Sequence, residues 1–342
     1  MKKCLAILLS AVLILTAAAG CGKARAPQSF SKAEGTVTVT DQIGREVTLE
    51  APAERIVSVY YLSTSLLVLL GASDRLVGIE KKADSRGLYR LASPELLDLE
   101  AVGSGKEIDV EKTAALAPDI VILPKKLKDS VEALEQAGLK VLVVNPETEE
   151  EFYSCVTLLG KVSGQTGKAS EYLAYCSGLR EQVEQVLGTV QERPRVYLSS
   201  ASSYQSTCTS GMYQTELIER AGGVSVSAGL SDNYWKQVSD EQIAAWEPQF
   251  WFRTADAEYS REDIESAPGL SRVPAVSGGQ LYQIPSEIEP WDYPTSSSIL
   301  GLVWMAHILH PEAVSEDFYR TSVSDFYQRF FQIEIGDEDY GL

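Results

Sequence analysis

Aromatic, cationic and small polar side chains follow several short apolar runs that are typical of β-strands. In open α/β sheets, ligands bind beyond the carboxyl ends of the strands, so residues directly after a strand are the first candidates for a binding site. Rings that stack and cationic heads at such positions indicate a cleft for a bulky, negatively charged ligand. The candidate ligand-binding residues are Tyr60, Tyr61, Ser63, Lys81, Lys106, Lys125, Tyr204, Arg253, Trp291, Asp292 and Tyr293.

These candidates differ in how strongly their context favours a role in binding. A single lysine after a strand is more often a solvated loop residue, whereas several of them in a chain of net charge −18 favour a role for at least one. Trp291 and Tyr293 rank higher, because large rings in a proline-flanked loop are costly to expose. Packing of these rings against the following helix is the alternative. Asp292 either orients a neighbour or binds the ligand.

Other patterns that could support chemistry are incomplete. The sequence GSGK at 103–106 resembles part of a phosphate-binding loop, but Glu100 replaces its first glycine and Glu107 replaces the required Ser or Thr. The sequence holds no GxSxG, HExxH or EF-hand pattern. His307 and His310 are its two histidines, too few for a His-rich site for bare zinc or manganese. We therefore expect no catalytic residue, no metal ligand and no cofactor.

The N-terminus has the pattern of an export signal. Lys2 and Lys3 precede an apolar run at 5–19 that is too short to span a bilayer comfortably. Small residues then lead to Cys21, an arrangement that resembles the lipobox of bacterial lipoproteins; an ordinary cleaved signal with a chance cysteine is the alternative. Residues 21–35 are small and polar, as expected for a flexible tether. We expect residues 1–20 to be removed and Cys21 to anchor an extracytoplasmic protein to the cell membrane.

The rest of the chain is expected to be a soluble monomer, attached to the membrane only through this lipid. Removal of residues 1–20 takes away two lysines and no acids, and such an acidic surface argues against nucleic-acid binding. The remaining cysteines, Cys155, Cys176 and Cys208, are odd in number. We expect buried free thiols, with a bridge between Cys155 and Cys176 as the less favoured alternative.

Short β-branched runs alternate with helical patterns, which is typical of βα units around a mainly parallel sheet. Strands are predicted at Arg55–Val59, Leu76–Ile79, Asp119–Leu123 and Lys140–Val144. We expect an α/β fold with Rossmann-like topology.

An internal repeat predicts two lobes of related design. The helical segment at 110–119 leads through Pro118 into a strand, and the segment at 239–249 does so again through Pro248. Between the repeats, Thr166–Leu187 has a helical rhythm and would be about 33 Å long. We expect an N-terminal lobe at 36–147, a connecting segment at 148–190 that includes this long helix, and a C-terminal lobe with closing helices at 191–342.

Several segments carry a family resemblance. Thr40–Leu49 (TDQIGREVTL), Pro52, Arg55–Ser58 and Leu70–Gly78 resemble the periplasmic-binding family of iron-siderophore and cobalamin ABC importers, in which a long helix joins two lobes. The resemblance implies transport rather than catalysis, with an ABC permease and an ATPase as partners. It also implies that an acidic residue on each lobe docks on permease arginines. The candidates for docking are Asp129 or Glu132 in the first lobe and Glu258 or Glu262 in the second.

The resemblance leaves the ligand open. The leading hypothesis is a substrate-binding lipoprotein that delivers a ferric siderophore, haem or corrinoid to its permease. An oxyanion such as molybdate on the same fold is the alternative, in which backbone N–H groups would replace aromatic walls. An extracytoplasmic enzyme or adhesin on this scaffold is the least favoured reading.

Overall fold

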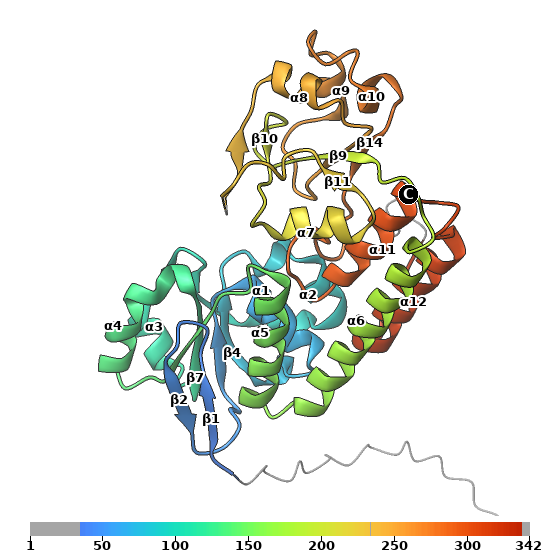
Figure 1. Cartoon of the computed structure of the whole chain (residues 1–342). Helices are drawn as coiled ribbons and strands as arrows, with labels where there is room; N and C mark the ends of the chain where they lie inside the picture. The colour runs from blue at the N-terminus through green and yellow to red at the C-terminus, as the bar shows by residue number, and fades with distance from the viewer. Residues whose placement is uncertain (1–34, 233, 337–342) are drawn as a thin grey trace, which may run out of the picture. The chain divides into compact units, whose positions relative to one another are not determined.

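Two six-stranded sheets carry the fold, one in the lower and one in the upper part of the view in Figure 1. The computed structural model describes residues 35–232 and 234–336. The expected export signal, Cys21 and nearly all of the expected tether lie outside these residues. None of the helices in the described ranges is long and apolar enough to cross a membrane.

The first sheet has the strand order β6-β5-β4-β3-β7-β8, and all its neighbours are parallel except β5 and β6. Strands β3 and β7 are buried along their whole length, as expected for central strands of a parallel sheet with mostly apolar sequences. The strands are β3 (Ile56–Ser58), β4 (Leu76–Glu80), β5 (Glu100–Ser104), β6 (Glu107–Ile108), β7 (Ile120–Pro124) and β8 (Val141–Val144). The accompanying helices are α1 (Tyr61–Leu69), α2 (Gly87–Ala92), α3 (Val110–Ala115) and α4 (Val131–Gln136), with 3-10 turns at Ser73–Arg75, Ala83–Ser85, Pro94–Asp98 and Lys125–Ser130.

A separate hairpin precedes this sheet and explains the TDQIG motif. Its strands are β1 (Val37–Thr40) and β2 (Glu46–Leu49). The carboxylate of Asp41 accepts hydrogen bonds from the backbone N–H of Ile43 at 3.1 Å and of Arg45 at 2.8 Å. Gly44 has a φ of +86°, in the left-handed region that favours glycine. The motif is therefore a turn stabilised by its own aspartate.

The second sheet has the order β12-β10-β9-β13-β14, with β11 also beside β9. Strands β9, β11, β13 and β14 pair in parallel, which confirms the mainly parallel α/β prediction for both lobes. The strands are β9 (Arg195–Ser199), β10 (Ser206–Thr207), β11 (Val224–Ser225), β12 (Lys236–Gln237), β13 (Phe250–Arg253) and β14 (Leu281–Gln283). The helices are α7 (Tyr213–Arg220), α8 (Asp240–Trp246), α9 (Arg261–Glu265) and α10 (Pro274–Ser277).

Two antiparallel helices lie between the sheets in sequence. Helix α5 (Glu149–Val162) begins with a capping box formed by Thr148 and Glu151. Helix α6 (Thr166–Leu187) has the bounds predicted for the long connector. A Cβ at Gly160 would lie 2.6 Å from the Cβ of Ala169, so this glycine permits the close packing of the two helices.

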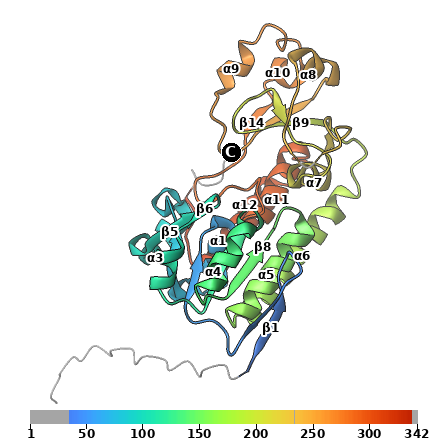
Figure 2. The same ribbon diagram turned by 90° about the vertical axis from the view of Figure 1, so that its left-hand side faces the viewer.

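The last two helices complete the first lobe as well as the second. Helix α11 (Ser298–Leu309) packs against α6 and α7, and α12 (Glu316–Phe331) packs against α11 and against α1 of the first lobe (Figure 2). One hydrophobic core therefore includes Ile122 of the first sheet, Phe252 of the second, Tyr172 of α6 and Phe326 of α12. The two lobes share this core.

The cysteines are buried and free. No disulfide is formed among Cys155, Cys176 and Cys208, as we expected. The alternative, a bridge between Cys155 and Cys176, is therefore wrong. Burial raises the pKa of Cys155 and Cys176, which keeps both as neutral thiols.

Candidate ligand-binding site

Residues from both lobes line a cavity of about 470 Å³. The first lobe supplies the start of α1 and the segments that follow β7 and β8, and the second lobe supplies the start of α7 and two loops. The first-lobe segments lie at the carboxyl ends of parallel strands, as expected for this fold class, whereas α7 follows the antiparallel strand β10. The lining consists of Tyr60, Tyr61, Leu62, Lys125, Asn145, Pro146, Glu147, Thr148, Glu151, Gly211, Met212, Tyr213, Gln214, Tyr234, Trp235, Tyr293 and Pro294.

Four of the predicted ligand-binding residues meet in this cavity: Tyr60, Tyr61, Lys125 and Tyr293. Burial raises the pKa of Tyr60, Tyr61 and Tyr293 above its usual value. In the ligand-free chain these side chains are therefore neutral phenols, which donate and accept hydrogen bonds.

Ser63 does not line the cavity but positions the tyrosines that do. Its hydroxyl donates to the backbone oxygen of Tyr60 at 2.8 Å and lies 2.8 Å from the hydroxyl of Ser58. The hydroxyl of Thr64 continues this chain to the carboxyl group of Glu80, also at 2.8 Å. Because these hydroxyl and carboxyl groups are all buried, their hydrogen bonds hold the start of α1, and with it Tyr60 and Tyr61, in a fixed position.

Gln42 of the hairpin motif holds the opposite wall of the cavity. Its carboxamide oxygen accepts from the N–H of Asn145 at 2.7 Å, and its nitrogen donates to the backbone oxygen of Glu151 at 2.8 Å. The TDQIG motif thus fixes the loop between β8 and α5, in addition to forming its own turn.

The structure corrects the expectation for Trp291, which is a core residue rather than a wall of the site. Its side chain is 2% exposed, and its indole N–H donates to the hydroxyl of Tyr327 at 3.1 Å. A Cβ at Gly301 would lie 2.3 Å from the backbone oxygen of Trp291, so the loop lies directly on α11. The alternative of packing against the following helices holds for this ring, because the loop folds inward at Trp291 and reaches the cavity only at Tyr293.

Lys81 and Lys106 also lie outside the cavity lining. Lys81 is exposed and forms an ion pair with Glu107 at 2.5 Å. Lys106 is exposed on the turn between β5 and β6. These positions fit the interpretation of both lysines as ordinary solvated loop residues.

Tyr204 and Arg253 are half-buried residues of the second lobe that do not line the cavity. The ring of Tyr204 lies against Trp251 and Tyr259, with centroids 6.3 and 6.0 Å away. Arg253 donates to the backbone oxygen of Tyr259 at 2.9 Å. Both follow or end a strand, as predicted, but the loop at 254–260 gives them local partners instead of a ligand.

Asp292 is fully buried behind the cavity wall. Neither of its carboxyl oxygens has a hydrogen-bond partner. Burial and then the nearby Asp256 carboxylate raise the pKa of Asp292 to about 7. Asp292 does not line the cavity, although its neighbour Tyr293 does.

Sequence reasoning missed the aromatic pair Tyr234 and Trp235, which lines the cavity from the second lobe. Tyr234 is 75% exposed, more than any other large apolar side chain in the ranges that the structure describes. The argument that large rings in a loop are costly to expose applies to this pair as well, but the pair lacks the flanking prolines that drew attention to Trp291. Met212 and Tyr213, at the start of α7, were missed as well.

Arg86 is a further residue that sequence reasoning missed, since it lies six residues after the end of β4 at Glu80. Its guanidinium lies 4.3 Å from the centre of the Tyr61 ring, and its buried Nε has no hydrogen-bond partner. Beside it is a second cavity of about 100 Å³ between the lobes, which Ser65, Ser85 and Ser286 also line. Tyr61 separates this small cavity from the large one.

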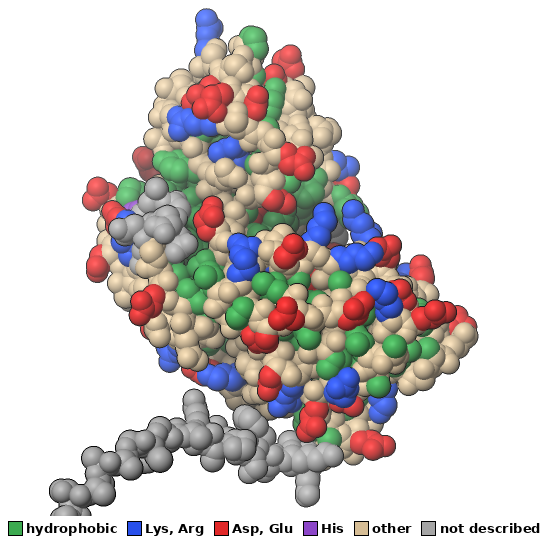
Figure 3. Space-filling model, turned by 180° about the vertical axis from the view of Figure 1, so that it is seen from behind, with side chains coloured by type: hydrophobic (Ala, Val, Ile, Leu, Met, Phe, Trp, Pro, Cys, Tyr) green, Lys and Arg blue, Asp and Glu red, His purple; other side chains and the backbone are tan. Residues whose placement is uncertain are grey.

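The described residues contain no group of three or more His, Cys, Asp or Glu side chains that could hold a metal ion. His307 and His310 instead bind backbone oxygens of Val314 and Gly222. All the proposed docking acids are exposed: Asp129, Glu132, Glu258 and Glu262. Glu258 lies in the loop before α9, not on a helix. On the face drawn in Figure 3, acidic and basic side chains are interspersed.

Comparison with known proteins supports one family. The family described as "Periplasmic binding protein" matches residues 56–288. The chain is 24% identical over 319 residues to the molybdate-binding protein MolA of Haemophilus influenzae, which covers 86% of this chain and 90% of that protein. The crystal structure of MolA bound to molybdate has a TM-score of 0.77 at 22% identity, covering 87% of this chain and 99% of that one.

Two further relatives carry different names. An uncharacterized ABC transporter substrate-binding lipoprotein of Bacillus subtilis, YvrC, is 25% identical over 324 residues, which cover 91% of this chain and 97% of the relative. A vitamin B12-binding protein of Vibrio vulnificus is 26% identical over 262 residues, which cover 74% of this chain and 88% of the relative. The relatives therefore agree on the kind of protein and differ in the ligand.

Proposed function

This chain belongs to the periplasmic binding protein family, whose members are transport substrate-binding proteins and not enzymes, and we propose that its own ligand is a bulky metal chelate. The single observation that carries this proposal is the cavity of about 470 Å³, which has aromatic side chains from both lobes. A tetrahedral oxyanion would leave most of this volume empty. A flat macrocycle would stack on the rings and bury them.

The charges of the lining refine the expected ligand. Lys125 is its one basic residue among the described side chains, whereas Glu147 and Glu151 are acidic. A strongly anionic chelate would therefore meet little compensation, contrary to the sequence-based expectation of a cationic cleft. Among ferric siderophore, haem and corrinoid, we favour a corrinoid, because its ring is large and its amide side chains suit neutral tyrosine and glutamine partners. The vitamin B12-binding relative supports this choice.

An oxyanion is the second candidate, and the small cavity favours it. Its volume of about 100 Å³, the guanidinium of Arg86 and three serine hydroxyls would suit a small tetrahedral anion. MolA, the molybdate-binding relative, supports this alternative. The two candidates therefore occupy different cavities on either side of Tyr61.

Isothermal calorimetry with cyanocobalamin, haemin, a ferric siderophore and molybdate tests both. We expect cyanocobalamin to bind, and Trp235→Ala to weaken its binding about tenfold or more, because a stacked aromatic contact is lost. Lys106→Ala, outside the cavity, serves as the control without effect. Tight binding of molybdate alone, abolished by Arg86→Met and indifferent to Trp235→Ala, would reject the chelate in favour of the oxyanion.

The importer partners follow from the same family. We propose an ABC permease and its ATPase as partners, with docking through Asp129 or Glu132 on the first lobe and Glu258 or Glu262 on the second. Reversing the charge of one acid on each lobe, for example Glu132→Lys with Glu262→Lys, is expected to abolish ligand uptake by cells and to leave ligand affinity unchanged. Normal uptake by such a double variant would exclude that pair.

A further inference from the structure

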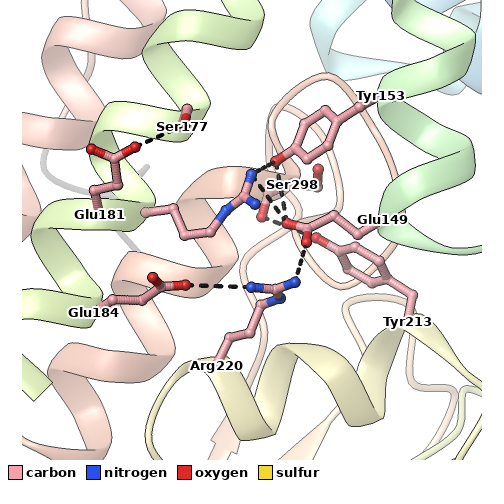
Figure 4. Close-up of polar contacts among 9 residues, drawn as sticks. Glu149, Tyr153, Ser177, Glu181, Glu184, Tyr213, Arg220 and Ser298 are labelled. Carbon is pink, nitrogen blue, oxygen red and sulfur yellow. Dashed lines mark hydrogen bonds and ion pairs between the residues drawn. The ribbon is translucent and has the colours of Figure 1, made fainter. Parts of the chain in front are cut away.

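An ionic cluster joins three helices behind the large cavity, and one carboxylate is shared at its centre. The Oε2 atom of Glu149 on α5 lies 2.7 Å from Nη2 of Arg220 on α7, and its Oε1 atom lies 3.5 Å from Nη2 of Arg180 on α6 (Figure 4). Arg220 also contacts Glu184 of α6 at 3.4 Å. The cluster therefore ties α5, the connector α6 and the second-lobe helix α7 together.

The centre of this cluster is shielded from water. The side chains of Glu149 and Arg180 are 15% and 21% exposed, and that of Arg220 is 38% exposed. The guanidinium of Arg180 also donates to the hydroxyl of Tyr153 at 2.9 Å and lies 5.1 Å from the centre of its ring. Pairs that are partly buried and held by several hydrogen bonds interact more strongly than exposed pairs do.

Two of these helices, α5 and α7, also begin with residues that line the large cavity. Thr148, which caps α5, lines the cavity and directly precedes Glu149. Tyr213, which begins α7, lines it too, and Arg220 ends this helix about 10 Å further along. Because α5 packs on α1 and β1, whereas α7 packs on β11 and α11, the pair connects one wall from each lobe.

We propose that Glu149 and Arg220 are positioning residues, whose ion pair fixes the spacing of α5 and α7 and thereby the width of the cavity between Thr148 and Tyr213. Neither residue lines this cavity. The pair acts by holding the two walls at the separation that the ligand requires, so that less of the binding free energy is spent on ordering them. This effect on affinity rests on the proposed function, whereas the spacing itself does not.

A double-mutant cycle with cyanocobalamin tests the effect on affinity. We expect Glu149→Gln and Arg220→Gln each to weaken binding roughly tenfold and the double variant to be no weaker than either single one. In Arg220→Gln, Glu149 keeps Arg180. In Glu149→Gln, Arg220 keeps Glu184 and Arg180 keeps the hydroxyl of Tyr153, so we expect folding to be retained. Arg220→Lys, which keeps the charge, is expected to bind nearly as the wild type does.

The matched control is the exposed pair Arg261–Glu265 within α9, whose side chains are 43% and 40% exposed. Arg261→Gln and Glu265→Gln remove the same charges away from the cavity and are expected to leave affinity unchanged. Effects of the two cluster variants that add up in the double variant would overturn the proposal. So would a lower melting temperature with unchanged affinity, which is the result that a merely structural role predicts.

Hydrogen exchange of the ligand-free chain tests the spacing independently of the ligand. We expect Glu149→Gln to speed exchange at the start of α5 and along α7, and to leave strands β3 and β7 unchanged. Unchanged exchange in both helices would refute the proposed spacing role. If the wild type binds no cyanocobalamin, the proposed function fails, and these exchange data still decide whether the pair holds the helices.

Discussion

Asp292 carries a carboxyl group that is fully buried beside the cavity. Asp292 lies near Asp256, Tyr61, Tyr213 and Tyr293, and both of its oxygens lack a hydrogen bond. A charged carboxylate in such a place costs free energy, so the folded protein favours the protonated acid. This is the reason that its pKa rises to about 7 from an ordinary value of 3.8.

The raised pKa of Asp292 predicts a pH dependence of stability with a defined sign. Between about pH 4 and 7, the folded state keeps a proton that the unfolded state has lost. Stability should therefore fall as the pH rises through this window and stay low above it. Asp292→Asn should remove this fall and increase the free energy of unfolding at pH 8 by a few kcal/mol.

Urea unfolding at pH 5 and pH 8 measures this effect, with Asp84→Asn on the surface as the control. A wild type and an Asp292→Asn variant with parallel pH profiles would show that the buried acid does not titrate in this range.

At the level of single residues, the sequence predicted which residues follow strands and line the cavity. It did not predict whether a loop turns its side chains toward the cavity or toward the core. Tyr60, Tyr61 and Lys125 were found because they directly follow strands, whose ends the periodicity locates. Trp291 and Trp235 are both tryptophans in loops, but the first is buried on α11 and α12 and the second lines the cavity. Whether a loop turns its ring inward depends on contacts with distant helices, which a local sequence pattern does not contain.

The internal repeat is visible among the elements in atomic detail. In the first lobe, the backbone oxygen of Arg55 accepts a hydrogen bond from the N–H of Asp119. The side chain of Arg55 donates to the carbonyl oxygen of Ala117, just after α3. In the second, Arg195 receives a backbone hydrogen bond from Gln249 and donates to the carbonyl of Trp246 at the end of α8. In each lobe, an arginine at the start of one strand (β3 or β9) therefore hydrogen-bonds the carbonyl groups at the end of the helix that precedes the neighbouring strand (β7 or β13).

The repeat also places a non-glycine residue in the left-handed region at the same point of each lobe. Ala117 has a φ of +46° and Glu247 a φ of +45°. Glycine is favoured there, so Ala117→Gly should raise the free energy of unfolding by up to about 1 kcal/mol. The same change inside α4, Ala133→Gly, should lower it by about 1 kcal/mol. Thermal unfolding that shows equal losses for both variants would contradict the argument.

Most elements of the first lobe and the connector were predictable, because strong hydrophobic periodicity and prolines mark them. The predicted strands and Thr166–Leu187 match β3, β4, β7, β8 and α6 within a residue or so at each end. The two-residue strands β10, β11 and β12 were not predictable, because they form only by pairing with β9 or with each other. The return of α12 to α1 was missed for the same reason: it is a contact between distant parts of the chain.

At the scale of the whole molecule, we expect the two lobes to move little relative to each other. Helix α6 is unbroken over 22 residues, and the hydrophobic core continues from one sheet to the other. A helix does not absorb large changes of φ and ψ as a loop hinge does, and opening the shared core would expose apolar surface. X-ray scattering curves of the ligand-free and cyanocobalamin-bound protein should therefore nearly superimpose. A marked compaction upon binding would reject this stiff connection.

The membrane anchor remains a proposal at the scale of the whole chain. Its support is the sequence around Cys21 and the relative YvrC, a substrate-binding lipoprotein. Radiolabelled palmitate should enter the wild type and not Cys21→Ala. Equal labelling of both proteins would exclude Cys21 as the acylated residue, and the chain would then be released after cleavage.

The return of the C-terminal helices to the first lobe determines when this protein can finish folding. Ser296 donates its N–H to the hydroxyl of Ser65, a contact 231 residues apart in sequence, and α12 covers α1. Contacts at such separations form slowly, because a long loop must close before they contribute free energy. The N-terminal lobe therefore stays incomplete until nearly the whole chain has been synthesised. We expect an unfinished chain to stay loosely folded during that time, a state that would suit the export proposed from its N-terminal sequence.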